Sequence, residues 1–333
     1  MEECGIIARL RHQASLNPKK IVLPEGGDVR IIEAAQKILK EKIARLVIFA
    51  KNKIDKSLEG YLKSGYLEVL DPESEEFIDK YASLYFEARR HKEVDFEVAE
   101  RIIRDNPVYS AALMVKSGEV DGFVAGASLS TSDVARAAIH CIGKQEGIST
   151  VLGIFIMVIP NSIYGENGTF IFADCAVVPN PNHVQLADIA VATAEFTANI
   201  LGIEPRVAML SYSSKGSSNS SSVDIIIEAT EIVKEKYPQL LIDGELQVDA
   251  AIIPEVARIK TPGSKVAGFA NVLIFPNLEA ANCSYKLVQR LARARAVGPI
   301  FLGLMKPASD LSRGCDVEDI IDAVAVTVIR AQK

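Results

Sequence analysis

The stretch that decides the fold class reads Lys20-Ile21-Val22-Leu23-Pro24, then Glu25-Gly26-Gly27-Asp28, then a run from Val29 to Leu39 with apolar residues at helical spacing. An almost wholly apolar strand, a tight turn and an amphipathic helix form the first half of a strand–helix–strand unit. A second apolar strand follows at residues 46–50, and a weaker one at 67–70. Apolar strands separated by helices build parallel sheets that helices cover on both faces. The sequence therefore predicts an α/β fold.

The same alternation continues along the chain. We expect further strands at 122–126, 151–159, 169–174, 206–211, 247–253, 271–275 and 299–304, and helices at 184–201, 223–237 and 279–294. A turn at 163–168 is expected to join two antiparallel strands. Because 333 residues exceed what one core usually supports, we expect two domains. We place the first at residues 1–143 plus 297–333 and the second at 144–296.

Composition excludes several classes of protein. A net charge of −6 is unlike the basic field of a nucleic-acid-binding protein. The longest apolar run, residues 151–159, ends at Pro160 and is too short to span a bilayer. Five scattered cysteines without a C-x-x-C pair indicate free thiols in a reducing compartment, and the acidic start lacks the pattern of a secretory signal. We expect a cytoplasmic protein that binds neither nucleic acid nor membranes.

The segment 307–321 carries the strongest chemical signal. Ser312, Arg313 and Gly314 directly precede a helix that begins near Asp316, and free amides at a helix N-terminus bind anions. Arginine adds a two-pronged donor suited to phosphate or to a developing oxyanion. Asp319 falls in the first helical turn, where the helix dipole favours a carboxylate. A capping box between Asp316 and Asp319 explains the same pattern without any function.

Two other loops follow strands in the same way. In residues 126–136, Ser128, Ser130 and Thr131 either cap a helix or bind an anion, and Arg136 lies about a turn and a half into that helix. The serine-rich stretch 211–217, with Ser213 and Lys215, either forms an oxyanion-binding loop or is simply flexible.

Charged clusters elsewhere leave two interpretations open. Residues 89–92 (Arg89-Arg90-His91-Lys92) are either solvated surface or a phosphate contact. Residues 243–249 offer three carboxylates, which suit either a divalent metal or a turn that leads into a strand. The four histidines show no metal-binding spacing, and the chain has neither a P-loop nor a G-x-G-x-x-G motif. We predict no metal site.

Taken together, these stretches resemble the phosphate acetyltransferase and phosphate butyryltransferase family, in its short form without an N-terminal regulatory part. The resemblance runs nearly end to end and rests on eight stretches in family order: Val22-Leu23-Pro24-Glu25-Gly26, Arg89-Arg90-His91-Lys92, 122–136, Phe172-Ala173-Asp174-Cys175-Ala176-Val177, 203–208, Asp243-Gly244-Glu245-Leu246-Gln247, 270–276 and 306–319.

The resemblance implies an architecture and an activity. It implies two three-layer α/β domains with mostly parallel sheets, built like isocitrate and isopropylmalate dehydrogenases, with the active site in the interdomain cleft of a homodimer. The reaction would be the reversible transfer of acetyl between acetyl phosphate and coenzyme A, giving acetyl-CoA and inorganic phosphate. Coenzyme A would be a substrate, with no tightly bound cofactor.

The resemblance also assigns residue roles. Asp319 matches the proposed base for the coenzyme A thiol, and Ser312 and Arg313 match the residues that bind the acyl phosphate and its carbonyl. Arg136 and one arginine of the Arg89-Arg90 pair, with Arg89 favoured, match positions linked to coenzyme A and phosphate.

Some residues depart from the family pattern. Leu302, Met305 and Phe269 differ from the usual acetyl-transferring sequence, as does Ser128-Leu129-Ser130, and a more apolar acyl pocket would favour propionyl or butyryl groups. The flanking motifs keep acetyl first. Two other classes stay open: a metal- and NAD-dependent decarboxylating dehydrogenase that uses the carboxylates of 243–249, and a non-catalytic protein that binds coenzyme A. Cys315 lies near the expected site, where we interpret it as a buried bystander thiol.

Overall fold

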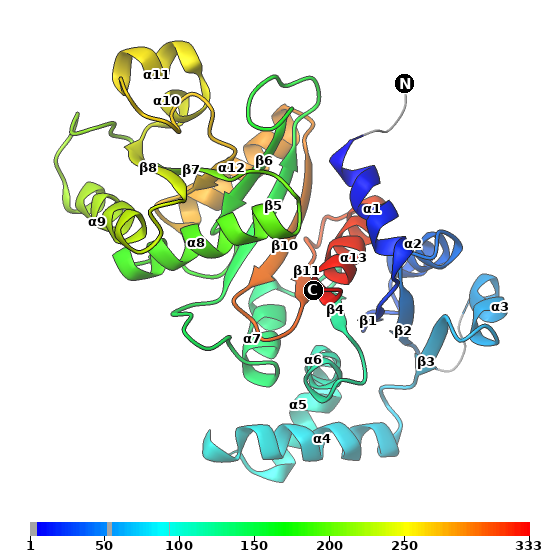
Figure 1. Cartoon of the computed structure of the whole chain (residues 1–333). Helices are drawn as coiled ribbons and strands as arrows, with labels where there is room; N and C mark the ends of the chain where they lie inside the picture. The colour runs from blue at the N-terminus through cyan, green and yellow to red at the C-terminus, as the bar shows by residue number, and fades with distance from the viewer. Residues whose placement is uncertain (1–4, 52–54, 93) are drawn as a thin grey trace. The chain divides into compact units, whose positions relative to one another are not determined.

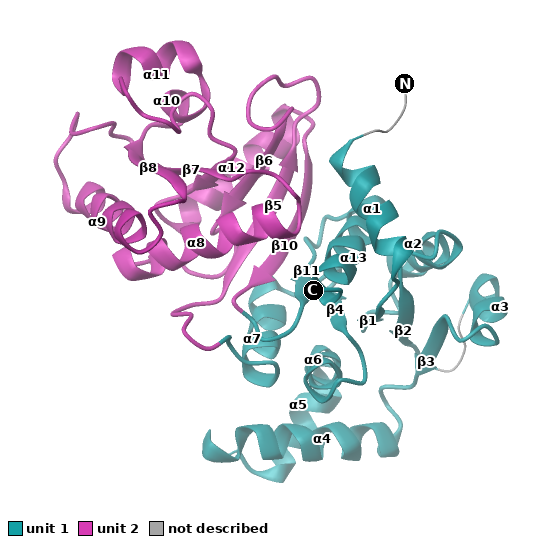
Figure 2. Ribbon diagram, viewed as in Figure 1, with its two compact units in different colours: residues 1–145, 304–333 teal, residues 146–303 magenta. Residues whose placement is uncertain are grey.

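The computed structural model describes residues 5–51, 55–92 and 94–333 (Figure 1). The chain divides into two compact units, unit 1 with residues 1–145 and 304–333 and unit 2 with residues 146–303 (Figure 2). In this division the long strand near residue 300 stays whole in unit 2, so the chain returns to unit 1 at Leu304.

Unit 1 contains a parallel sheet in the order β3-β2-β1-β4-β11. Its strands are β1 (Lys20–Leu23), β2 (Arg45–Phe49), β3 (Leu67–Leu70), β4 (Gly122–Ala125) and β11 (Ala308–Asp310). Strands β1, β2 and β4 are buried almost throughout, as their apolar sequences predict. The expected parallel α/β sheet is confirmed. Strand β11 was not predicted: Ala308-Ser309-Asp310 lacks the large apolar side chains by which the other strands were recognised.

Two groups of helices accompany this sheet. Helix α13 (Val317–Ala331) packs on β1, β4 and β11 and on α1 (Ile6–Leu16) and α2 (Val29–Lys40). Every α13 residue from Ile320 to Ile329 is buried, the pattern of a helix enclosed on all sides. The second group contains α4 (Glu75–Arg89), α5 (Phe96–Asp105), α6 (Val108–Ser117) and α7 (Thr131–Cys141), and the short α3 spans Glu59–Leu62.

Unit 2 contains a mixed sheet in the order β10-β5-β6-β9-β7-β8. Its strands are β5 (Leu152–Val158), β6 (Thr169–Ala173), β7 (Arg206–Leu210), β8 (Leu241–Leu246), β9 (Val272–Ile274) and β10 (Arg295–Leu302). Strand β5 is antiparallel to both β10 and β6, whereas β6, β9, β7 and β8 run parallel. The antiparallel pair that was expected around the turn at 163–168 is thereby confirmed.

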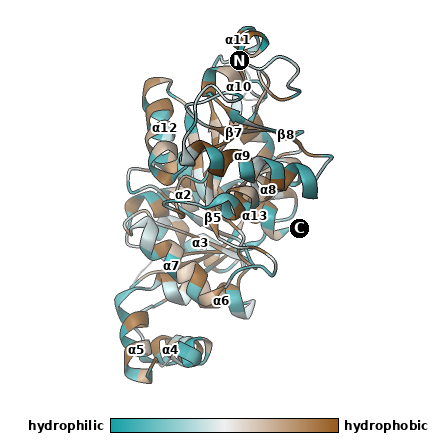
Figure 3. Ribbon diagram, turned by 90° about the vertical axis from the view of Figure 1, so that its left-hand side faces the viewer, coloured by the Kyte–Doolittle hydropathy of each residue, from teal (hydrophilic) through white to brown (hydrophobic). Residues whose placement is uncertain are grey.

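The helices of unit 2 are α8 (His183–Asn199), α9 (Ser221–Lys236), α10 (Val248–Ile252), α11 (Pro254–Lys260) and α12 (Leu278–Leu291). Along α12, hydrophilic and hydrophobic residues alternate in the way expected of a helix with one packed face (Figure 3). Phe155 stacks on Tyr285 with ring centroids 4.1 Å apart, which joins α12 to β5 in the core. Within the described chain, no helix combines the length and the apolar character that crossing a membrane requires.

One predicted strand of unit 2 is wrong. The strand expected at 247–253 is helix α10, and the true strand, β8, directly precedes it. Apolar and polar residues alternate from Leu246 through Asp249, across the end of β8 and the start of α10, so the spacing of apolar residues does not mark the boundary. Asp249 in the first helical turn and the pair Ala250-Ala251 favour a helix, because alanine has the highest helix propensity and the dipole favours an early acid.

The start of α8 offers a test of this local reasoning. Asn182 and Gln185 form a reciprocal capping box there. We expect Asn182→Ala to lower the free energy of unfolding by about 1 kcal/mol, measured by urea denaturation, because the helix loses its side-chain cap. Ser220→Ala is the matched control, since Ser220 precedes α9 without capping it through its side chain. Equal effects of the two substitutions would contradict the assignment.

Candidate active site

The candidate site of unit 1 lies where three neighbouring strands end. Strands β1, β4 and β11 are adjacent and parallel, so their carboxyl ends share one edge of the sheet. In open α/β sheets this is the edge at which ligands bind. The segments that leave it are residues 24–28, 126–130 and 311–316, and two of them contain candidates from the sequence.

Glu25 organises this edge. Its carboxylate is 9% exposed and accepts hydrogen bonds from the N–H groups of Gly126 (2.7 Å), Ala127 (3.0 Å), Ser128 (2.7 Å) and Leu129 (3.2 Å) and from the Ser128 hydroxyl (2.7 Å). The loop after β4 therefore does bind an anion, but the anion is the Glu25 carboxylate and not a ligand. Sequence reasoning had no role for Glu25, although an acid directly after a buried strand was a usable signal.

Arg30 holds the carbonyl groups of the same edge. It donates to the carbonyl oxygens of Ala127 (2.7 Å), Arg313 (2.9 Å) and Cys315 (2.9 Å). Asp28 orients it through contacts of 2.6 and 3.0 Å, and the Arg30 guanidinium in turn lowers the pKa of Asp28. Arg30 therefore ties the loop after β4 to the loop before α13, a role that the sequence did not reveal.

The loop before α13 presents Ser312 and Arg313. The Ser312 hydroxyl accepts the Gly314 N–H at 3.3 Å, and its carbonyl accepts the Cys315 N–H at 2.8 Å. The Arg313 side chain is exposed and makes no hydrogen bond or ion pair with other described residues. Its backbone is fixed by Arg30 while its guanidinium faces solvent, an arrangement that suits a binding group.

Asp319 takes part in a capping box. Its Oδ2 accepts the Asp316 N–H at 3.1 Å, and Asp316 accepts the Asp319 N–H at 2.9 Å. The capping interpretation of this pair is thus confirmed. It is compatible with a chemical role, because Asp319 is half-buried in the first turn of α13, seven residues beyond Ser312.

The start of α7 contains the other serine and threonine candidates. Ser130 is the N-cap: it accepts the Asp133 N–H at 3.2 Å and donates to the Asp133 carboxylate at 2.6 Å. Thr131 is the first residue of the helix. Arg136 is exposed and contacts Asp133 at 3.2 Å.

A group of cations gathers near the C-terminal end of α7. Burial, then the charges of Arg89 and Arg136, lower the pKa of His140, so both guanidinium groups lie close enough to act on that imidazole. The Arg89 Nε and the His140 Nδ1 are buried without a hydrogen-bond partner among the described residues. Arg90 is exposed in the short 3-10 turn that follows α4. The structure thus brings Arg89 and Arg136 together, and adds His140, which the sequence did not suggest.

The candidates of unit 2 contact carboxylates of their own unit. Glu245 accepts the Ser213 hydroxyl at 3.0 Å and the Gly216 N–H at 2.7 Å. Lys215 pairs with Asp243 at 2.5 Å. The serine-rich loop is therefore folded around Glu245.

The carboxylates considered for a metal are also engaged. Besides Lys215, Asp243 contacts Lys234 at 3.4 Å, and Asp249 pairs with Lys260 at 2.7 Å. Across residues 5–51, 55–92 and 94–333, no group of three or more histidine, cysteine or acidic side chains is arranged to hold a metal ion.

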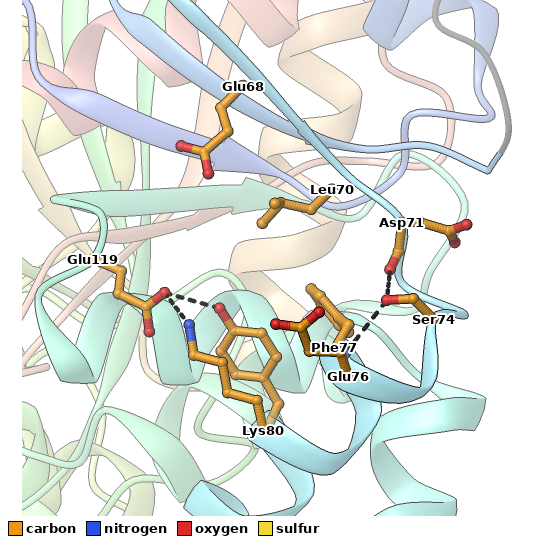
Figure 4. A pocket seen from close by; sticks show the side chains of 9 residues that line it. Glu68, Leu70, Asp71, Ser74, Glu76, Phe77, Lys80 and Glu119 are labelled. Atoms are coloured by element: carbon orange, nitrogen blue, oxygen red, sulfur yellow. Dashed lines mark hydrogen bonds and ion pairs between the residues drawn. The ribbon is translucent and has the colours of Figure 1, made fainter.

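A separate pocket of about 250 Å³ lies beside β3 and the start of α4 in unit 1 (Figure 4). Glu119 there accepts hydrogen bonds from Lys80 (2.7 Å) and Tyr81 (3.0 Å). None of the candidate residues lines it.

The cysteines near these segments are buried. Burial raises the pKa of the Cys315 thiol to about 11 and that of Cys175 well above its ordinary value, which makes both poor nucleophiles at neutral pH. Cys141, Cys175, Cys283 and Cys315 are free thiols, and Cys4 lies outside the described residues.

Comparison with known proteins assigns the chain to a family. The family model for phosphate acetyl/butaryl transferase matches residues 5–328. The chain belongs to this family. It is 49% identical to a phosphate acetyltransferase of Thermoanaerobacterium thermosaccharolyticum over 98% of this chain and 100% of that protein, and 47% identical to one of Acetivibrio thermocellus over 98% of both.

Solved structures agree. A phosphotransacetylase from Streptococcus pyogenes superposes with a TM-score of 0.88 at 38% identity and covers 100% of this chain and 99% of that one. A 4-hydroxythreonine-4-phosphate dehydrogenase from Klebsiella pneumoniae has a TM-score of 0.53 at 9% identity, over 95% of this chain and 98% of that one, and shares the fold alone. The expected α/β fold with mostly parallel strands is confirmed, as is the family resemblance.

Glu25 provides the test of the site's construction. We expect Glu25→Gln to lower the free energy of unfolding by about 2 to 3 kcal/mol, because an amide has one acceptor oxygen and no charge to satisfy five donors. Urea denaturation measures the change, and Glu87→Gln, exposed on α4, is the matched control. A Glu25 variant as stable as the control would show that the loop after β4 does not depend on this carboxylate.

Proposed function

We propose that this chain catalyses the reversible transfer of an acetyl group between acetyl phosphate and coenzyme A. The observation that carries the proposal is the Arg313 side chain. It is exposed at the carboxyl edge of the unit 1 sheet, directly before α13, on a backbone that Arg30 fixes. Membership of a family of phosphate acyltransferases supports an acyl phosphate as the ligand of that edge.

The chemistry follows from the residues at this edge. A thiol with a pKa of about 8.5 is only a few per cent ionised at pH 7, so a carboxylate that accepts its proton generates the nucleophile. Asp319 takes that role. The sulfur then attacks the acetyl carbonyl carbon, and a C–S bond replaces the C–O bond to phosphate, which leaves with the bonding electron pair.

Negative charge on the carbonyl oxygen needs donors during this attack. Arg313 supplies charged N–H groups and Ser312 a hydroxyl, and such donors act mainly on the transition state. Direct attack by the thiolate requires neither a covalent enzyme intermediate nor a metal. Holding two anionic substrates side by side supplies much of the remaining acceleration.

Coenzyme A carries phosphate groups that need cations. Arg89 and Arg136 are proposed to bind these phosphates, and the exposed Arg90 is proposed as a further contact. Ser128, Ser130 and Thr131 remain candidate contacts in unit 1, and Ser213 and Lys215 in unit 2. Coenzyme A is then a substrate that enters and leaves, and inorganic phosphate is the second product. The free cysteines support a reducing, cytoplasmic setting, and we propose a homodimer on the family resemblance.

The acyl group is tested first. We expect thioester formation from coenzyme A to be fastest with acetyl phosphate and to fall with propionyl and then butyryl phosphate, without added metal or nicotinamide. Of the three residues that depart from the usual acetyl-transferring sequence, Leu302 is buried in β10, whereas Phe269 and Met305 are exposed. A preference for butyryl phosphate would keep the mechanism and change the substrate. No turnover with any acyl phosphate would refute the proposal.

The residue roles are tested by substitution. We expect Arg313→Gln to lower kcat by about 10²- to 10³-fold through loss of a charged oxyanion donor. Asp319→Asn should lower kcat strongly, because an amide cannot accept the thiol proton. Asp316→Asn is the matched control for the helix start, since asparagine caps as well as aspartate. If Asp316→Asn is as inactive as Asp319→Asn, the capping box rather than a base explains the loss.

A further inference from the structure

One buried acid of unit 1 has no role in the mechanism above. Asp310 is the last residue of β11 and is 0% exposed. Neither of its carboxyl oxygens has a hydrogen-bond partner among the described residues. Buried polar groups are nearly always paired, and an unpaired buried charge is strongly unfavourable. Its chemical state therefore needs an explanation.

Asp310 lies against the loop that Glu25 organises. A Cβ atom added to Gly126 would overlap Asp310 Oδ1 and would come within 2.8 Å of the Leu311 backbone. The N–H of the same glycine donates to Glu25 at 2.7 Å. Two carboxyl groups thus flank one peptide, and only Glu25 receives donors from it. The Thr131 hydroxyl and the Leu311 N–H lie near Asp310 without meeting hydrogen-bond geometry.

The charges around Asp310 do not compensate a carboxylate. Strand β4, which pairs with β11, has no ionisable side chain. Helices α7 and α13 also pack on β11, and their ionisable groups are Asp133, Arg136, His140, Cys141, Glu318, Asp319, Asp322 and Arg330. The charge that acts on Asp310 is that of Glu25, and it is negative.

Burial raises the pKa of Asp310 to about 8. Thr131 and Leu311 lower this pKa by less than burial raises it, and the charge of Glu25 adds a small further increase. The side chain is therefore a neutral acid at pH 7, which removes the conflict between its burial and its lack of partners.

We propose that Asp310 is a positioning residue that supports the Ser312–Arg313 segment as a neutral carboxylic acid, and that its ionisation in alkaline solution stops acyl transfer. The proposal rests on the function proposed above. An ionised Asp310 would face Glu25 without a counter-charge, and relief requires the chain at Leu311 to move towards water. Ser312 and Arg313 are the next two residues, so they would leave the position in which they meet an anionic substrate.

The test compares the wild type with Asp310→Asn, which keeps the shape and cannot ionise. We expect the variant to stay active at pH 7. The ratio of the wild-type to the variant kcat/KM should be nearly constant below about pH 7, fall to about half near pH 8 and approach a tenfold fall per pH unit above about pH 9, as a single ionisation requires. Taking the ratio cancels the titration of coenzyme A and acetyl phosphate. Asp79→Asn, exposed on α4, is the matched control and should give a flat ratio.

The outcomes separate the two proposals. No wild-type turnover at any pH would refute the acyltransferase function, whereas an active wild type with a flat ratio up to pH 9.5 would overturn only the role of Asp310. An inactive but folded Asp310→Asn protein at pH 7 would also overturn it, since a neutral side chain should suffice.

Two further measurements do not depend on activity. Carbon-13 NMR of wild-type protein labelled at the aspartate Cγ should show one resonance that titrates near pH 8, and titration of all aspartates in the ordinary range would overturn the proposal.

The second measurement is stability against pH. In the folded state Asp310 keeps a proton that the unfolded chain releases above the ordinary aspartate pKa of 3.8. The wild type should therefore lose stability relative to Asp310→Asn between pH 4 and pH 8, and a constant difference would contradict a protonated Asp310.

Discussion

The carboxylate of Glu25 is the constraint on which the candidate site depends. It gathers four consecutive N–H groups and one hydroxyl from the loop after β4, and so fixes where α7 begins. Arg30 acts in the opposite sense and gathers carbonyl oxygens. Ala127 shows how closely the two cooperate, because its N–H donates to Glu25 and its carbonyl accepts from Arg30. At this edge the charged side chains of Glu25 and Arg30 thus bind backbone N–H and carbonyl groups that regular secondary structure would otherwise pair.

This construction fixes the backbone of the loop that carries the candidate binding groups Ser312 and Arg313. Binding groups are effective when neighbouring contacts hold them in position before the ligand arrives. The backbone of Arg313 is held by Arg30, and the helix that follows, α13, is buried from Ile320 to Ile329. The Arg313 guanidinium is then the solvent-exposed end of a residue whose backbone is fixed. Since its donors face solvent, binding an acyl phosphate breaks no protein hydrogen bond of that side chain.

Most of the fold could be predicted from the sequence because the strands are apolar on both faces. The error at 247–253 arose where an alternation of apolar and polar residues continues from β8 into α10, and β11 was missed because Ala308-Ser309-Asp310 carries no hydrophobic signal. The family motifs gave Ser312, Arg313 and Asp319 but not what supports them. Glu25 and Gly126 are 101 residues apart and Arg30 and Arg313 are 283 apart, and neither propensity nor periodicity contains such contacts.

Gly126 connects the two acids of this edge. Its φ of +113° and its contact with Asp310 leave no room for a side chain, so its bare peptide separates Glu25 from Asp310. On one side the carboxylate is solvated by the backbone, and on the other the acid is enclosed and unpaired. An apolar residue at position 310 would satisfy packing without the cost of desolvating a carboxyl group. Asp310 is therefore locally unfavourable, and it lies at a strand end beside the proposed chemistry. Proteins are expected to keep such unfavourable residues at functional sites.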